Sequence, residues 1–162
     1  MIDISYAGAK IYLSTRAGDS VGPITEFSDE GSPVEIPDID IADGNMNLNG
    51  ILVTWTKAQA AEFSLTLIPN SQSEKILATW LSAHAIGGRG AIPEAFIDQL
   101  QLVIPANVNV SGTSSKNSLI YTFKNGRMRR GAPATGTNSE GKMNAKTYNF
   151  IFEQVMSVTG KA

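Results

Sequence analysis

The stretch Ile51–Leu67, ILVTWTKAQAAEFSLTL, decides the fold class of this chain. Apolar and polar residues alternate from Glu62 to Leu67, the period-two pattern of a β-strand with one buried face. Ile51, Val53 and Trp55 alternate with Thr54 and Thr56 in the run before it. The two runs predict an antiparallel strand pair that turns at about residues 57–61.

The acid-rich run before this stretch also predicts a strand. Aspartates and isoleucines alternate over residues 38–41, but the apolar residues Met46 and Leu48 fall on the opposite parity. A bulge at Asp43-Gly44 would restore one buried face, because an extra residue shifts the pleat by one and glycine tolerates the required dihedrals. Pro37 is expected at an edge or at the start of a strand.

One helix is predicted at about residues 71–85. Ser71 and Glu74 have the spacing of a capping box, and apolar residues recur at helical spacing after them. Gly87-Gly88 would end the helix, because glycine readily adopts the left-handed conformation that is common there.

The second half of the chain predicts further strands. Residues 100–104 and 147–152 alternate in the same way, and Asn125-Gly126 indicates a tight hairpin turn between strands at 119–124 and 127–130. The expected fold is mainly β with one α-helix, in a single domain spanning residues 1–162. Long polar loops are expected at about 14–33, 105–118 and 131–145, and loops of this length are often functional.

Acidic and basic side chains are sorted along the sequence. Residues 1–81 hold eleven acids and four bases, whereas residues 82–162 hold nine bases and four acids. Complementary faces on one subunit would favour head-to-tail contacts between copies. The alternative is that the two signs interleave in the folded chain and cancel locally.

Composition and motifs argue against an enzyme, a metal site or a membrane protein. Only 17% of residues are charged, no cysteine is present, and Met1-Ile2-Asp3 lacks the positive start of a secretory signal. Gly18–Gly22 matches a nucleophile elbow and Gly136–Lys142 resembles a phosphate loop, but neither has the flanking elements that its motif requires. Asp38–Gly44 departs from the ligand spacing of a calcium loop. We therefore expect no catalytic, cofactor-binding or metal-binding residues, and we expect a soluble protein.

Two segments carry a resemblance to the phage tail tube protein family. Residues 27–50, FSDEGSPVEIPDIDIADGNMNLNG, resemble that family's N-terminal region, in which an acid-rich strand leads to an asparagine-rich turn and a strand with a tryptophan, here Trp55. Residues 126–153, GRMRRGAPATGTNSEGKMNAKTYNFIFE, resemble its closing hairpin. The resemblance implies an antiparallel β-sandwich or barrel flanked by a helix, similar to type VI secretion tube proteins.

The resemblance also implies a structural subunit of a virion. Copies would form rings, expected to be hexameric, that stack into a tube conducting DNA, and they would be assembled in the host cytoplasm. Expected partners are further copies, with sheath, baseplate and tape-measure proteins and DNA in transient passage, and no membrane. The residues expected to face the lumen are Asp38, Asp40, Glu62, Ser64 and Thr66.

A second set of charged residues is expected to set the register between subunits. It consists of Asp29, Glu30, Glu35, Asp43, Arg127, Arg129, Arg130 and Lys142. Three alternatives remain open: another ring component of the tail or baseplate, a type VI secretion-type tube protein, or a monomeric β-sandwich binding module.

Overall fold

The alternating run at residues 61–67 forms a strand in the computed structural model, which describes residues 8–16, 18, 20–28, 32–85, 96–107, 116–137 and 139–161. Within these residues there is one helix, α1 (Gln72–Ala85). The strands are β1 (Lys10–Thr15), β2 (Ser20–Ile24), β3 (Val34–Glu35), β4 (Ala42–Met46), β5 (Leu52–Thr56), β6 (Ala61–Leu67), β7 (Phe96–Asn107), β8 (Lys116–Gly131) and β9 (Lys146–Lys161). The predicted fold class, mainly β with one helix, is confirmed.

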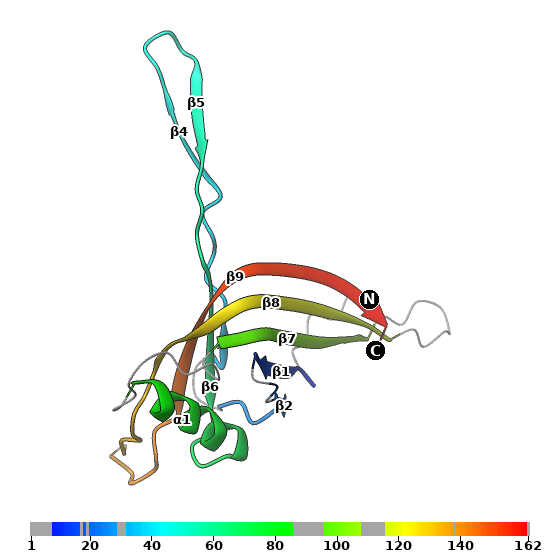
Figure 1. The fold of residues 1–162 in the computed structure, drawn as a ribbon, viewed down its shortest axis with the longest axis vertical. Coiled ribbons are helices and arrows are strands. Elements are labelled where there is room, and N and C mark those ends of the chain that lie inside the picture. The colour runs from blue at the N-terminus through cyan, green and yellow to red at the C-terminus, as the bar shows by residue number, and fades with distance from the viewer. Residues whose placement is uncertain are drawn as a thin grey trace.

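Seven strands form one antiparallel sheet in the order β2-β1-β7-β8-β9-β6-β3. The long strands β8 and β9 arch across the molecule, and α1 lies beside their lower ends in Figure 1. Among the described strands, β4 and β5 pair only with each other, as a separate two-stranded sheet. Figure 1 shows this hairpin standing well clear of the body.

The core is built on the alternation that the sequence predicts. Every second residue of β6 is buried, from Ala61 to Leu67, and the aromatic residues of β9 face the same side. The ring centroid of Phe123 on β8 lies 5.2 Å from that of Phe63 and 5.3 Å from that of Phe152. Such edge and tilted contacts add to the stabilisation from burial alone.

A buried carboxylate joins α1 to the sheet. Ser71 Oγ accepts a hydrogen bond from the Glu74 amide at 3.4 Å, while Glu74 Oε2 accepts one from the Asn70 amide at 3.3 Å. The predicted helix start is therefore confirmed, with Glu74 reaching one residue further back than a capping box requires. Glu74 Oε1 also accepts a hydrogen bond from Tyr148 at 3.0 Å and pairs with Lys146 Nζ at 2.8 Å. The predicted end at Gly87-Gly88 lies outside the described residues.

The hairpin turn predicted at Asn125-Gly126 is wrong. Strand β8 continues through both residues, paired with β7 on one side and β9 on the other. Asn125 has a φ of 55°, so the left-handed conformation that often makes a turn here kinks a continuous strand instead. A Cβ on Gly126 would overlap the Ile151 carbonyl oxygen and the Phe152 ring, so this glycine permits a close approach of β9.

The kink coincides with a change of the buried face. Along β7 the buried residues switch from Ile97 to Leu100 and Leu102, which lie on the opposite parity. Ile97 is paired with Gly126, whereas Leu100 and Leu102 are paired with residues of β8 on the other side of Asn125. One sheet can thereby present different faces to the core at its two ends.

The strand pair predicted within residues 51–67 is also wrong. Strand β5 pairs with β4, and β6 pairs with β9 and β3, so residues 57–60 connect two sheets instead of making a turn. Alternation shows that a segment is a strand but does not identify its partner. The turn is made by Asn47, whose Oδ1 accepts hydrogen bonds from the amides of Asn49 at 3.0 Å and Ile51 at 2.9 Å.

The predicted bulge at Asp43-Gly44 is absent. The register of β4 and β5 is continuous from Ala42 opposite Thr56 to Met46 opposite Leu52. Because the hairpin buries neither face, no change of parity is needed. Pro37 lies after β3, outside any strand.

The predicted loops are shorter than expected. The loop predicted at 14–33 contains β2. The loop predicted at 105–118 is shorter, because β7 extends to Asn107 and β8 begins at Lys116. In the third, Thr137 and Met143 form an isolated bridge.

Candidate functional site

The β4–β5 hairpin and its root expose an unusual amount of apolar surface. The side chain of Leu48 at the tip is fully exposed, at 107%, and Ile41 is 75% exposed. The other exposed large apolar residues of this region are Ile36, Ile39, Met46, Ile51, Leu52, Val53 and Trp55. Large exposed apolar patches mark sites of interaction.

The hairpin is connected to the body by a stalk, which we define as residues 36–41 with the facing residues 57–60. These residues lie outside the β4–β5 ladder, and two hydrogen bonds join its sides: Lys57 N to Ile41 O at 2.9 Å and Asp40 N to Gln59 Oε1 at 2.9 Å. Asp38 and Asp40 are exposed, and neither carboxylate has an ion-pair partner among the described residues. The stalk therefore offers free acids and free apolar side chains together.

Three residues predicted to face a lumen lie together on the outer face of the sheet, opposite the core. Glu62, Ser64 and Thr66 are the half-buried members of β6. Thr66 Oγ1 hydrogen-bonds Thr147 Oγ1 at 2.9 Å, and Ser64 Oγ accepts a hydrogen bond from Asn149 Nδ2 at 2.7 Å. These cross-strand pairs make an uncharged polar surface.

The predicted interface arginines lie on the same outer face. Ile151 is opposite both Glu62 and Arg127, and Asn149 is opposite both Ser64 and Arg130. Directly opposite residues of antiparallel strands point to one face. Arg129, at the irregularity between them, forms an ion pair with Glu62 of its own chain. The sequence assigned these arginines and Glu62 to different surfaces, whereas the structure brings them together.

The other predicted residues are scattered. Asp38 and Asp40 belong to the stalk and not to the β6 face. Asp43 forms an ion pair with Lys57 at 3.2 Å. Glu35 is exposed on the edge strand β3, Lys142 is exposed in the loop before β9, and Asp29 and Glu30 lie outside the described residues. The ion pairs Glu62–Arg129 and Glu74–Lys146 join the acidic and basic halves within one chain, as the interleaving alternative predicts at those positions.

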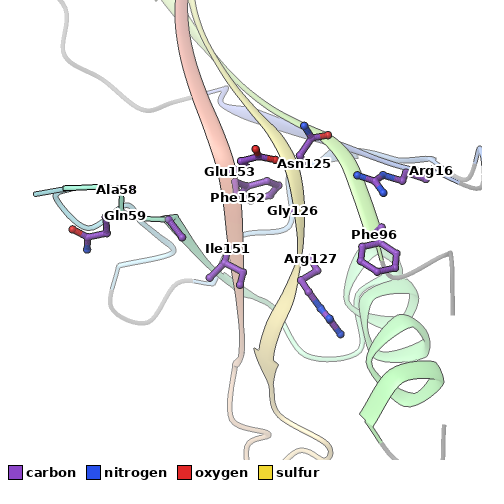
Figure 2. Close-up of a pocket in the computed structure, with 11 residues that line it drawn as sticks. Arg16, Ala58, Gln59, Phe96, Asn125, Gly126, Arg127, Ile151, Phe152 and Glu153 are labelled. Atoms are coloured by element: carbon purple, nitrogen blue, oxygen red, sulfur yellow. The ribbon is translucent and has the colours of Figure 1, made fainter. Parts of the chain in front are cut away.

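A hollow of about 540 Å³ lies between residues 58–60 of the stalk and the parts of β8 and β9 around Gly126 and Phe152. The guanidinium carbons of Arg16 and Arg127 lie 5.4 Å and 5.6 Å from the centroid of the Phe96 ring. Figure 2 shows both arginines beside Phe96 at this hollow, with Ile151 and Gln59 on its other side. Neither arginine has a carboxylate partner in the part of the chain that the structure describes.

Sequence reasoning missed this basic and aromatic site. Arg16, Phe96 and Arg127 come from three distant segments, and only the β1–β7 and β7–β8 pairings bring them together. No local spacing could have found Arg16 or Phe96, although Arg127 belongs to the charged set that the sequence predicts at subunit contacts.

The residues considered for catalysis do not lie in the structural elements that a catalytic motif requires. Ser20 is the first residue of β2, and the next element is a strand, not the helix of a nucleophile elbow. His84 lies in the last turn of α1. Within the described residues no three histidine, cysteine or acidic side chains are grouped as a metal site. The helix that the structure describes is too short and too polar to cross a membrane.

A family model described as tail fiber protein gp32 matches residues 2–156. The chain belongs to this tail fiber protein gp32 family. No curated protein sequence matches it.

Three solved structures resemble this gp32-family chain over nearly its whole length. A sheath/tube terminator of the PVC extracellular contractile injection system has a TM-score of 0.60 at 10% identity, covering 96% of each chain. The tube-terminating cap of the anti-feeding prophage has a TM-score of 0.59 at 8% identity, covering 99% of this chain and 95% of the cap. A chain of the PVC sheath-tube complex has a TM-score of 0.58 at 9% identity, covering 98% and 94%.

These likenesses show a shared fold. The tail-tube-like resemblance inferred from the sequence is confirmed at this level.

Proposed function

We propose that this chain is a structural, non-enzymatic subunit of a phage tail tube. Copies of a single domain, residues 1–162, associate into rings, hexameric by analogy with the tail-tube family, that stack into a hollow tube conducting DNA. The protein is assembled in the host cytoplasm and becomes part of the virion. The exposed apolar β4–β5 hairpin carries this proposal, because the described chain leaves it uncovered.

The physical argument starts from the hairpin. An isolated two-stranded hairpin is at best marginally stable in water. Within the described part of the chain β4 and β5 pair only with each other, and their apolar side chains are exposed on both faces. Contact with a second copy would bury this surface and stabilise the hairpin, at about 25 cal/mol for each Å² of apolar area removed from water.

The sheet edges support the same proposal. Strand β3 and the bridge of Phe27 with Leu67 pair the second half of β6, so among the described residues only the first three residues of β6 are unpaired on that edge. Strand β2 forms the opposite edge of the sheet. Unpaired edges are sites for adding a further strand, and closing a ring of sheets removes them.

In this proposal the lumen is lined by the outer face of β6 and β9 at its Ser64 and Thr66 rows, and the hollow at Ile151 and Arg127 lies outside it. The two rows, Ser64 with Asn149 and Thr66 with Thr147, are uncharged and already hydrogen-bonded. Such a surface would hold phosphates weakly and let DNA slide. The sequence predicts an acidic and hydroxyl lining, but Arg130 shares this face and Arg129 forms an ion pair with Glu62.

Replacing Leu48 with aspartate tests the function. The tip side chain is fully exposed, so Leu48→Asp should leave the fold intact but prevent burial of the tip against another copy. We expect the original protein to form rings or tubes by sedimentation velocity and negative-stain electron microscopy, and the variant to sediment as a monomer. Gln72→Asp, an equal charge change at an exposed position of α1, is the matched control.

A ring that ends the tube is a second candidate function. Two of the structural neighbours are a sheath/tube terminator and a tube-terminating cap. Single closed rings in the micrographs would favour this candidate over long hollow tubes. A persistently monomeric protein at high concentration would refute both and favour a binding module.

A further inference from the structure

We infer that the Arg16–Phe96–Arg127 hollow is the receptor for the stalk of a second copy, with Asp38 and Asp40 of one subunit paired to Arg16 and Arg127 of another. This inference rests on the proposed self-association and identifies which surfaces meet.

The hollow has the chemistry of a site for an acidic and apolar segment. Arg16 and Arg127 hold their guanidinium groups against one aromatic ring, which limits their freedom and fixes two positive charges near each other. Phe152 and Ile151 supply apolar lining, together with Ala58 and Ala60 from the stalk of the same copy. A ligand that fills this hollow therefore needs both carboxylates and apolar groups.

The stalk supplies these groups in alternation. Residues 36–41 read Ile-Pro-Asp-Ile-Asp-Ile, and the isoleucines are exposed together with the unpaired aspartates. In an extended segment alternate side chains point to opposite sides, so carboxylates can meet the arginines while isoleucines meet the apolar lining or a neighbouring strand.

A polynucleotide fits the hollow less well. Glu153 also lines the hollow and would repel a phosphate and a carboxylate alike, so this acid does not separate the two ligands. The apolar lining gives a phosphate backbone no partner. The apolar lining therefore favours the stalk, whose aspartates alternate with isoleucines.

Engineered cysteines test the contact directly, because the chain has none of its own. The single variants Ile39→Cys and Ile151→Cys keep all four charges, carry different mass tags, and are mixed and oxidised. A disulfide between them can only join two subunits. We expect a cross-linked heterodimer, and we expect none when Ile39→Cys is mixed with Lys75→Cys, whose cysteine lies on exposed α1.

Charge exchange gives the second measurement. Arg16→Glu/Arg127→Glu and Asp38→Lys/Asp40→Lys should each weaken self-association roughly tenfold by sedimentation, the combined effect of two exposed ion pairs. An equimolar mixture of the two variants should recover part of the lost association, since each variant offers the other a complementary surface. Circular dichroism verifies that both variants fold.

The outcomes separate this inference from the proposed function. Rings or tubes without the specific cross-link would overturn the stalk contact and leave self-association standing. Absence of any assembly would overturn both. Arginine variants that assemble normally but no longer bind a labelled DNA duplex in fluorescence polarisation would assign the hollow to phosphate and refute the stalk as its occupant.

Discussion

At the scale of single residues, Glu74 is the carboxylate on which the helix position depends. Glu74 is only 4% exposed. Its carboxylate accepts hydrogen bonds from Tyr148 and the Asn70 amide and forms an ion pair with Lys146. Burial opposes its ionisation, but the hydrogen bonds from Lys146 and Tyr148 and the charge of Lys146 outweigh burial and lower its pKa. The ionised carboxylate thus binds one end of β9 to the first turn of α1.

Replacing Glu74 with glutamine should destabilise the chain by roughly 3 kcal/mol, because the largely buried ammonium of Lys146 loses its partner. A folded-state pKa below the ordinary 4.5 means that this stabilisation is present above pH 4.5 and is lost as the pH falls through the folded value. Urea unfolding at a series of pH values should therefore show the two proteins converging in acid. The double variant Glu74→Gln/Lys146→Met should recover much of the loss, and a constant difference at every pH would contradict this account.

At the scale of elements, the sequence predicts strands better than it predicts their partners. Alternation identified β6 and the start of β9 because half of each strand is buried, and Ser71 with Glu74 located the helix start. Pairing depends on contacts between distant segments, so Asn125-Gly126 could not be recognised as a kink in β8 without β7 and β9 beside it.

The candidate surfaces also depend on contacts between distant segments. Alternation correctly separated Glu62, Ser64 and Thr66 from the core, but it could not show that Arg129 crosses β9 to reach Glu62. Local sequence patterns could not predict the Arg16–Phe96–Arg127 hollow for the same reason.

The turn of the hairpin should be separable from the body. Asn47→Ala removes the side-chain oxygen that accepts hydrogen bonds from two turn amides, and we expect the β4–β5 hairpin of the monomer to lose about 1 kcal/mol of local stability. Because β4 and β5 pair only with each other, amide hydrogen exchange should accelerate in these strands and remain unchanged in β6 to β9. Asn45→Ala, in exposed β4, is the control. Faster exchange throughout the body would refute a separable hairpin.

At the scale of the whole molecule, two forces can drive self-association, and they respond differently to salt. The proposed stalk contact depends on exposed charges, and the hairpin depends on apolar burial. In about 1 M sodium chloride the Debye length is roughly 3 Å, so the charge contribution is largely screened. Sulfate strengthens apolar burial instead.

We therefore expect sodium chloride to weaken association by roughly tenfold without abolishing it, the loss matching that of the two exposed ion pairs. Sodium sulfate at equal ionic strength should restore much of it, as measured by sedimentation velocity over a concentration series. Leu48→Asp should fail to associate in either salt, because it removes the apolar contact that screening leaves intact. Complete dissociation in sodium chloride with no recovery in sulfate would mean that charges alone hold the subunits together, and the exposed hairpin would then need a different partner.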